Sequence, residues 1–348
     1  MNKVGLTPER LQQLVSDFPK ARIGVLGDFF LDKYLEVSPE LAEPSVETGK
    51  IAHQVTEVRC SPGAAGTVVC NLQALGTGSI YALGFRGDDG EGYDLNKELH
   101  RLGCDTTHLH QTELRATPTY LKPRDTTVAG LAGEHSRYDT KNRSVTPAEI
   151  EDLIIRSIHE MVDQLDSLIV LDQVEEKDCG VVTRRVRQAV SELAATRERP
   201  IFWADSRCQI QDFTHLIIKP NEYEAAGIEK PLPDTVVEND ELLEAAQKLH
   251  TRNQAPVVIT RGSQGMLVSN PDWTAVPGVH IEGAIDPTGA GDSATAGTVL
   301  ALCAGATLPE AALIGNLVAS ITIQQLSTTG VARPDQLADR LKMWQQQQ

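Results

Sequence analysis

The second half of the sequence alternates between short apolar segments and longer segments with helical periodicity. The apolar segments are 167–171, 200–204, 215–218 and 256–259, and the helical ones include 178–196 and 239–253. Such alternation is typical of a parallel sheet with helices on both faces. An apolar segment near the N-terminus, 21–26, fits the same sheet. We therefore expect an α/β fold with a doubly wound, mainly parallel sheet flanked by helices.

A polar residue stands at or just after the expected end of each strand. These residues are Asp28, Asp172, Asp205, Asn221 and Thr260. Open α/β sheets bind ligands at the carboxyl ends of their strands, so the pattern predicts a cleft at this edge. Asp28 and the nearby Asp32 are candidates for binding hydroxyl groups. A turn role for Asp28 and a solvated position for Asp32 are the alternatives.

The segment Asp286–Asp292 reads DPTGAGD and precedes a run of small and apolar residues that predicts a helix. Its two glycines let the backbone approach a ligand closely. The amides of Gly289, Ala290 and Gly291 would lie at a helix N-terminus, which favours an anion. A carboxylate beside an anion repels it, so Asp292 is better suited to take a proton from a hydroxyl that attacks a phosphoryl group. The alternative is that Asp292 only caps a buried helix.

Two polar, β-prone regions interrupt the α/β pattern. Residues 35–60 and 104–140 contain short β-prone pieces separated by turns, and they predict a small β-sheet lid on a single domain spanning residues 1–348. His108 and His110 fall in the second region, where two histidines without a third ligand are more often surface residues than a metal site. Because exposed β-flaps tend to pair, we also expect a homodimer formed through the lid.

The acidic composition excludes several classes of partner. The chain has 348 residues and a net charge of −16, which argues against nucleic acid and anionic membranes. No run of 18 or more apolar residues occurs, so no membrane span is predicted. The six cysteines lack zinc-binding spacing and are expected to be reduced thiols of a cytoplasmic protein.

Several common catalytic motifs are absent from the sequence. It contains no GxxxxGKS/T P-loop, and no GxGxxG follows the first predicted strand. These absences argue against P-loop enzymes and weaken a dinucleotide-binding interpretation. No Ser/His/Asp or Cys/His arrangement can be assigned from spacing.

Five segments resemble, in order and spacing, the motifs of the PfkB (ribokinase-like) carbohydrate kinases. They are Gly27–Asp32, Pro62–Leu75, Asn221–Glu224, Thr260–Gly265 and Asp286–Asp292. The agreement extends over about residues 21–332, and short motifs in such an order rarely match by chance. Within the family, the GDFFLDKY start and the stretch Asp205–Phe213 are most similar to kinases that act on heptose 7-phosphate.

The resemblance implies a ribokinase-like core with a β-sheet lid, and phosphoryl transfer from ATP with Mg²⁺ to a sugar hydroxyl. It leaves open whether a monovalent cation is also needed. By position, Asp292 would be the base and the amides of Gly289–Gly291 the anion hole, while Asn221 and Glu224 would organise Mg²⁺ and phosphates. Nucleotide contacts are expected from Thr260, Gly262, Gly265 and the region of Asn316. Sugar contacts are expected from Asp28, Asp32 and Gly63.

The sequence departs from the family pattern mainly on the substrate side. Ala64 follows Gly63 where the family usually has a second glycine, and Thr67 stands where the family has a sugar-binding asparagine. The alanine adds a methyl group where close approach is needed, and the threonine lacks the amide's combined donor and acceptor.

The positions after Asp172 differ as well. The heptose-phosphate kinases have a tyrosine and a lysine there, whereas Gln173 and Val174 follow here and the next lysine is Lys177. Lys177, Arg207 and Lys219 are candidates for a substrate phosphate, although solvated lysines and arginines are the commoner case.

Three other functions stay open at this stage. A sensor that binds a sugar or nucleotide without turnover would explain the altered segment 63–67. A nucleoside kinase would share the fold and the base. A dinucleotide-dependent oxidoreductase is the weakest alternative, because the sequence lacks its glycine motif.

Overall fold

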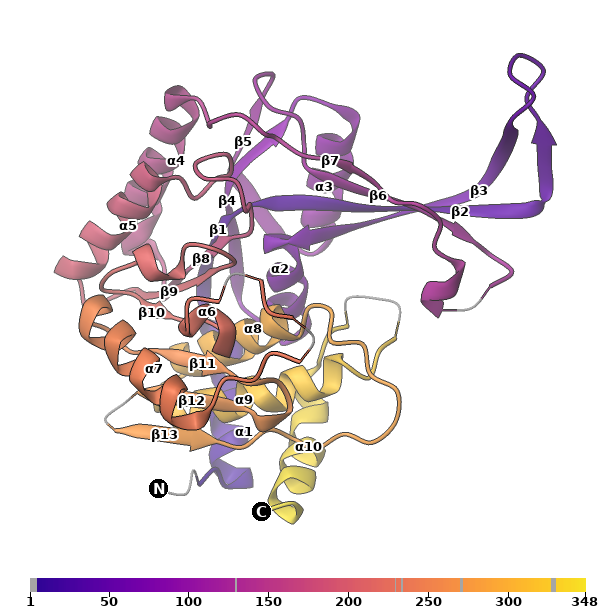
Figure 1. The fold of residues 1–348 in the computed structure, drawn as a ribbon. Coiled ribbons are helices and arrows are strands. Elements are labelled where there is room, and N and C mark those ends of the chain that lie inside the picture. The colour runs from indigo at the N-terminus through magenta and orange to yellow at the C-terminus, as the bar shows by residue number, and fades with distance from the viewer. Residues whose placement is uncertain (1–4, 129, 229, 233, 270–271, 327–329) are drawn as a thin grey trace.

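A six-stranded parallel sheet forms the centre of the computed structural model, which describes residues 5–348 except 129, 229, 233, 270–271 and 327–329 (Figure 1). The strand order is β10-β9-β8-β1-β4-β5. The strands are β1 (Arg22–Gly27), β4 (Ser79–Gly87), β5 (Cys104–Thr112), β8 (Ser167–Asp172), β9 (Ile201–Ser206) and β10 (Ile217–Ile218). The chain winds outward from β1 through β4 to β5 and then restarts at β8 on the other side. The predicted doubly wound α/β fold is confirmed.

Helices cover both faces of this sheet because its strands are apolar on both sides. One hydrophobic cluster contains residues of α1 (Pro8–Asp17), α2 (Ala65–Ala74), α3 (Gly90–Arg101), α8 (Ala290–Cys303), α9 (Leu308–Thr322) and α10 (Pro334–Gln346). The opposite cluster contains residues of α4 (Ala148–Met161), α5 (Arg184–Thr196) and α7 (Asn239–Asn253). Strand β8 shows the alternation directly: Ile169 and Leu171 enter the first cluster, whereas Leu168 and Val170 enter the second.

Three antiparallel strands extend the sheet beyond β10. They are β11 (Val258–Thr260), β12 (Met266–Ser269) and β13 (Trp273–Val276). Parallel bridges join Ile218 to Val257 and Asn221 to Thr260, which brings the ends of β10 and β11 together. Among the described residues, no helix has both the length and the hydropathy needed to cross a bilayer.

A separate four-stranded sheet forms the lid, which projects from the body as a long hairpin (Figure 1). Its strand order is β3-β2-β6-β7, with β2 (Phe29–Pro44), β3 (Ile51–Ala64), β6 (Thr119–Asp125) and β7 (Tyr138–Thr140). Strand β2 begins two residues after β1 ends, so Asp28 lies at the junction of core and lid.

The assignment of residues 104–112 to the lid is wrong. These residues form β5, the edge strand of the central sheet, which pairs in parallel with β4. An edge strand is half exposed, so its polar alternation looks like that of a lid strand. His108 and His110 face α4, where Nδ1 of His108 and Nε2 of His110 lie 3.0 and 2.8 Å from Oγ of Ser157. Within the motif Pro62–Leu75, residues 62–64 form the end of β3, and α2 begins after them at Ala65.

Candidate active site

The carboxylates that follow β1, β8 and β9 meet at the carboxyl edge of the central sheet. Asp28 comes directly after β1, Asp172 ends β8, and Asp205 lies one residue before the end of β9. All three residues are buried. Strands β1 and β8 are the neighbours between which the winding of the sheet reverses, and open α/β sheets form their ligand clefts at this point.

Helix α8 points its N-terminus at this edge. Gly289 has a φ of 77°, a left-handed conformation that glycine adopts without strain, and its carbonyl begins the helix. The Ala290 amide donates to Pro287 O at 3.1 Å, which corrects the prediction that this amide is open to an anion. Because first-turn amides have no intrahelical acceptor, the open N–H groups among the described residues of the first turn are those of Gly291 and Asp292. The predicted amide of Gly289, at the N-cap just before the helix, also has no hydrogen-bond acceptor among the described residues.

Asp292, the predicted base, is the third residue of α8. Burial and the nearby Asp205 carboxylate raise the pKa of Asp292 to about 7, against the opposing charges of Lys219 and Arg207. The residue as a whole is nevertheless partly exposed. The N-cap position belongs to Gly289, so the alternative that Asp292 only caps the helix is wrong. A carboxyl group that titrates near neutrality suits a general base.

Lys219 supplies a buried positive charge beside this base. Its Nζ lies 2.7 Å from Oδ2 of Asp205. A Cβ atom added at Gly291 would lie 3.5 Å from the same nitrogen, so the ammonium adjoins the open amides of α8. Burial lowers the pKa of Lys219, but Asp205, Glu224 and Asp292 together raise it above its ordinary value. The site therefore combines a protonated amine, two open amides and a titratable carboxyl group.

Asn221 and Glu224 cap the short helix α6 (Glu222–Ala225) through reciprocal hydrogen bonds. Oδ1 of Asn221 accepts from the amides of Tyr223 and Glu224, both at 2.9 Å, and Oε2 of Glu224 accepts from the Asn221 amide at 2.7 Å. These bonds fix the Glu224 carboxylate at the edge of the sheet. Burial and Asp205 raise the pKa of Glu224 to about 7.

This group of carboxylates fits a magnesium ion bound together with phosphates. Asp205 raises the pKa values of both Glu224 and Asp292, so negative charge is in excess and a divalent cation would relieve the repulsion. In the described part of the chain, no group of three or more His, Cys, Asp or Glu residues could hold a metal alone. Mg²⁺ is usually bound by one or two carboxylates with substrate phosphates, so Glu224 and Asp205 suffice.

The predicted nucleotide-binding residues converge on β11–β13. Thr260 ends β11 and pairs with Asn221. Gly262 and Gly265 both have positive φ, and a side chain at Gly265 would overlap the backbone at 276–278. Nδ2 of Asn316 donates to the carbonyls of Val276 and Pro277 at 3.1 and 3.2 Å. Gly265 and Asn316 thus shape the backbone of this wall, whereas Gly262 has open space around it.

On the opposite side of the cleft, Asp28 organises a loop. Its carboxylate accepts hydrogen bonds from the amides of Gln173 (3.0 Å) and Val181 (2.7 Å). Burial raises the pKa of Asp28, although these amides act in the opposite direction. Asp28 also lines a cavity between the lid and the sheet, so the turn role and the ligand-facing role coexist.

Asp32 lies in the lid strand β2 and is buried, so the solvated alternative is wrong. Its Oδ1 lies 2.8 Å from Nζ of Lys122 on the neighbouring strand β6. A Cβ atom at Gly63 would come within 2.7 Å of its Oδ2, so a side chain at this position would displace the carboxylate.

The altered residues Ala64 and Thr67 lie at the start of α2. Ala64 has a φ of 51° and a ψ of −117°, a conformation that normally belongs to glycine. Thr67 is buried within the helix, and its carbonyl accepts from Nδ2 of Asn71 at 3.0 Å. Lys177 is the lysine that follows Asp172 in place of the family's nearer one. It is exposed and does not line the cavity.

The cavity between lid and sheet has a volume of about 20 Å³ in this structure, room for about one water molecule. Its lining includes residues that the sequence did not single out. They include Phe30, Tyr120, Lys141 and Asn142. Arg207 also lines it, with Nε 3.0 Å from Oε1 of Gln173, and its charge lowers the pKa values of Asp28, Glu224 and Asp292. Arg207 thus lies between the cavity and the proposed base. Tyr120 and Lys141 belong to lid segments whose pairing could not be read from sequence, so no local signal identifies them.

Comparison with known proteins agrees with this geometry. Residues 34–335 match the pfkB family of carbohydrate kinases. The chain is 28% identical to the bifunctional protein HldE of Desulfatibacillum aliphaticivorans over 330 residues, covering 91% of this chain and 62% of that protein. The HldE protein of Coxiella burnetii (strain Dugway 5J108-111) is also 28% identical, with 92% and 64% covered. The chain therefore spans less than two thirds of these relatives.

Solved structures share the fold. Phosphofructokinase-2 from Escherichia coli, in complex with fructose-6-phosphate, superposes with a TM-score of 0.68 at 18% identity, covering 93% of this chain and 99% of that one. Arabidopsis thaliana ribokinase, complexed with ribose and ATP, gives a TM-score of 0.63 at 16% identity, with 92% and 99% covered. The resemblance found in the motifs is confirmed: the chain belongs to the pfkB family of carbohydrate kinases.

Proposed function

We propose that the protein transfers the γ-phosphoryl group of ATP to a hydroxyl group of a sugar or sugar phosphate, with Asp292 as the general base. One observation carries the proposal: a carboxyl group with a pKa of about 7 adjoins two open helix amides and a buried ammonium. A hydroxyl nucleophile needs a base, and the transferred group needs fixed positive charge. The first turn of α8 supplies both.

In this mechanism the acceptor hydroxyl gives its proton to the Asp292 carboxylate as its oxygen attacks the γ-phosphorus of ATP. The bond from that phosphorus to the bridging oxygen breaks, and ADP is the leaving group. The amides of Gly291 and Asp292 and the ammonium of Lys219 stabilise the charge on the transferred group. Glu224 and Asp205 would hold Mg²⁺ together with the phosphates, and the ion would neutralise charge there. The Asp205–Lys219 pair keeps the ammonium oriented toward α8.

We place the nucleotide along β11–β13 and the acceptor under the lid. Thr260, Gly262 and the wall held by Asn316 form the nucleotide side. Asp28 and Asp32, with Gly63, Ala64 and Thr67 behind them, form the acceptor side. Arg207 and Lys141 line the cavity under the lid together with the carboxylates of Asp28, Glu175 and Glu176, and this cavity must widen to admit an acceptor. Guanidinium and ammonium groups bind phosphates well. We therefore favour an acceptor that already carries an anionic group, with heptose 7-phosphate as one candidate.

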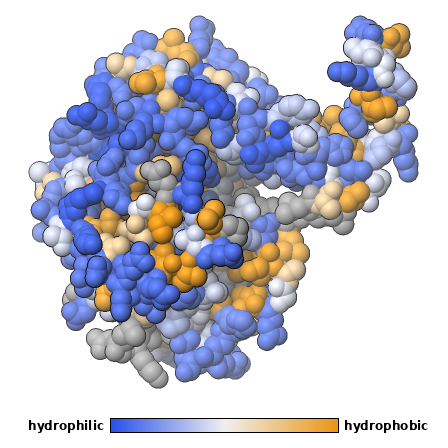
Figure 2. Space-filling view, in the orientation of Figure 1, coloured by the Kyte–Doolittle hydropathy of each residue, from blue (hydrophilic) through white to orange (hydrophobic). Residues whose placement is uncertain are grey.

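The exposed surface of the lid is the basis on which we propose a homodimer. Its long hairpin exposes apolar side chains along the strands and at the tip (Figure 2). These residues are Leu41, Val46, Ile51, Val55 and Val58. Exposed apolar residues on an extended β-hairpin mark an interaction surface, and a second copy of the lid would cover them. The proposed compartment is the cytoplasm, where ATP is available.

A screen of acceptors tests the function. Sugars, sugar phosphates and adenosine are offered with ATP and Mg²⁺, with and without K⁺, and ADP release is measured. Release with a sugar or sugar phosphate supports the proposal, and release with adenosine alone supports a nucleoside kinase. Binding of a sugar without ADP release from any acceptor supports a sensor.

The variant Asp292→Asn tests the base once an acceptor is known. We expect kcat to fall by about 10²–10⁴-fold while ATP binding persists. Asp335→Asn is the matched control, because Asp335 also lies in the first turn of a helix but is exposed on α10. Turnover of Asp292→Asn equal to that of the control would reject the assignment.

A further inference from the structure

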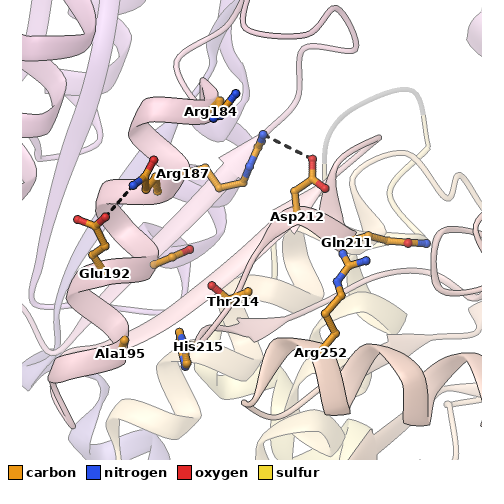
Figure 3. Close-up of a pocket in the computed structure, with 11 residues that line it drawn as sticks. Arg184, Arg187, Glu192, Ala195, Gln211, Asp212, Thr214, His215 and Arg252 are labelled. Atoms are coloured by element: carbon orange, nitrogen blue, oxygen red, sulfur yellow. Dashed lines mark hydrogen bonds and ion pairs between the residues drawn. The ribbon is translucent and has the colours of Figure 1, made fainter.

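A second cavity lies on the outer side of α5, away from the proposed catalytic residues (Figure 3). It has a volume of about 620 Å³ and lies between α5, residues 211–215 and the end of α7. None of its lining residues belongs to the cavity under the lid. Its volume is in the range of pockets that bind small organic molecules.

Three guanidinium groups from different places along the chain line this cavity. Arg184 and Arg187 lie one turn apart on α5, and Arg252 approaches from the end of α7 (Figure 3). In the described part of the chain, neither Arg184 nor Arg252 has a carboxylate within ion-pair distance. The carboxylates of the lining already have partners, since Glu192 accepts from Nε2 of Gln188 at 2.8 Å and Asp212 faces Arg187.

Arg187 is the unusual member of this group, because its side chain is only 7% exposed and its donors are poorly filled. Nη2 lies 3.6 Å from Asp212 and Nη1 lies 3.9 Å from Asp172, and both distances exceed a normal hydrogen bond. Within the described residues Nη1 has no hydrogen-bond partner. Nη1 is buried and faces Asp172, whereas Nη2 faces Asp212, which lines the cavity. The long, weak contact with Asp212 leaves Nη2 able to exchange this carboxylate for another oxyanion.

We propose that this cavity binds a small phosphate ester and that Arg187 couples its occupancy to the acceptor side of the active site. Guanidinium groups pair with phosphate oxygens in a bidentate manner. A phosphate held by Arg184 and Arg252 would compete with Asp212 for Nη2 of Arg187.

The proposed coupling follows from the contact that Nη1 of Arg187 makes with Asp172 on the active-site side. Asp172 accepts a hydrogen bond from Oγ of Ser206 at 2.7 Å and adjoins Gln173, which Asp28 and Arg207 both contact. The guanidinium carbon of Arg187 lies 5.6 Å from the centroid of the Phe213 ring, so the guanidinium packs over this ring between Asp212 and Asp172. A change in the pairing of Arg187 therefore reaches the loop that lines the acceptor cavity.

Inorganic pyrophosphate is the probe for binding. Its association is measured by calorimetry with the cleft saturated by a non-hydrolysable ATP analogue and Mg²⁺, so that the nucleotide site is blocked. We expect one equivalent to bind to the wild type and the affinity of Arg184→Gln/Arg252→Gln to fall by about tenfold or more. Arg185→Gln is the matched control, because Arg185 lies on the same helix but pairs with Glu151 and Asp152 outside the cavity.

Equal affinities of the double variant and the control would overturn the site. The coupling is tested by the KM of the acceptor, which should change with pyrophosphate in the wild type and in Arg185→Gln but not in the double variant. Binding without any change in KM would overturn the coupling. This second arm depends on the proposed kinase function, whereas the calorimetry is independent of turnover and stays interpretable if no acceptor is found.

Discussion

The ammonium of Lys219 and the carboxylate of Asp205 form a buried ion pair, 2.7 Å from nitrogen to oxygen, next to the first turn of α8. The negative charges of Glu224 and Asp292 join that of Asp205 in raising the pKa of Lys219, so one ammonium faces three carboxyl groups. Removal of the lysine would leave three carboxylates together without their nearest cation. This arrangement makes Lys219 a sharper test of the site than the carboxylates themselves.

We expect Lys219→Met to lower kcat by about 10²-fold or more, since one preorganised charge at the transferred group is lost. Lys219 lowers the pKa values of Asp292 and Glu224, so its removal should also move the acidic limb of the kcat/KM profile to higher pH. Lys33→Met is the control, because it removes a partly buried lysine paired with Glu91 and Asp94 outside the cleft. An unchanged acidic limb in Lys219→Met would contradict the assignment.

The pKa of Asp292 also predicts how stability depends on pH. It is raised from 3.8 to about 7 in the folded protein, so the folded state binds more protons than the unfolded state between these values. Stability from this group is present below pH 4 and is lost as pH rises through 7. Asp292→Asn should therefore be more stable than the wild type at pH 8, measured by urea unfolding, with the difference shrinking toward pH 5. A difference that does not vary with pH would be inconsistent with the raised pKa.

Gly291→Ala separates folding from catalysis. The added Cβ would lie 3.5 Å from Nζ of Lys219, an ordinary contact, so the fold should tolerate it. The methyl group would occupy the space of the transferred group, and we expect kcat to fall by about tenfold or more with Tm unchanged or raised. Gly90→Ala is the control, since it also begins a helix but its Cβ meets nothing within 4 Å. Full activity in Gly291→Ala would argue against an anion at this turn.

Ala64→Gly should stabilise the protein by about 1 kcal/mol, because the strain of a positive φ exceeds the entropy that glycine adds to the unfolded chain. The φ of Ala64 is 51°. The adjacent Ala65→Gly is the control and should destabilise, since Ala65 lies inside α2 and is buried. Thermal unfolding of the two variants gives opposite shifts if the strain is real, and shifts of the same sign would count against it.

Lysines introduced on the exposed strand of the hairpin test the proposed lid dimer. We expect Val55→Lys/Val58→Lys to give a monomeric mass by light scattering where the wild type gives a dimer, because buried lysines at a β interface repel one another. Val145→Lys, an exposed position outside the hairpin, should leave the mass unchanged. A monomeric wild type at micromolar concentration would reject the dimer.

The parts of the fold that were predictable share one physical cause. Strands buried on both faces have continuous apolar interiors, as in residues 168–171 of Ser167–Asp172, so their ends and the carboxylates found there are visible in the sequence. The edge strand Cys104–Thr112 is half exposed and was misassigned for that reason. Asp292, the proposed base, stands out in the sequence because small residues and a carboxylate follow one another locally.

The remaining parts depend on contacts between distant segments. Lys141 and Tyr120 reach the cavity only because β6 and β7 pair beside β2. The Ala290 amide is hydrogen-bonded because the turn brings the Pro287 carbonyl to it, and the motif does not specify this turn. Arg187 looks like any surface arginine on an amphipathic helix until Asp172 and Asp212 are seen on either side of it.

Asp28 fixes the root of the lid to the sheet. Its amide donates to Leu171 O, its carbonyl accepts from the Ala65 amide, and its carboxylate holds the loop at 173–181. Because these hydrogen bonds hold both the backbone and the side chain of Asp28, the lid has no hinge at the point where it leaves the core. Any change in its angle must arise farther out, where the pairing of β2 with β3 is irregular between Glu36 and Val37 and again between Ser38 and Glu43. The outer hairpin can then flex while the residues nearest the acceptor keep their alignment.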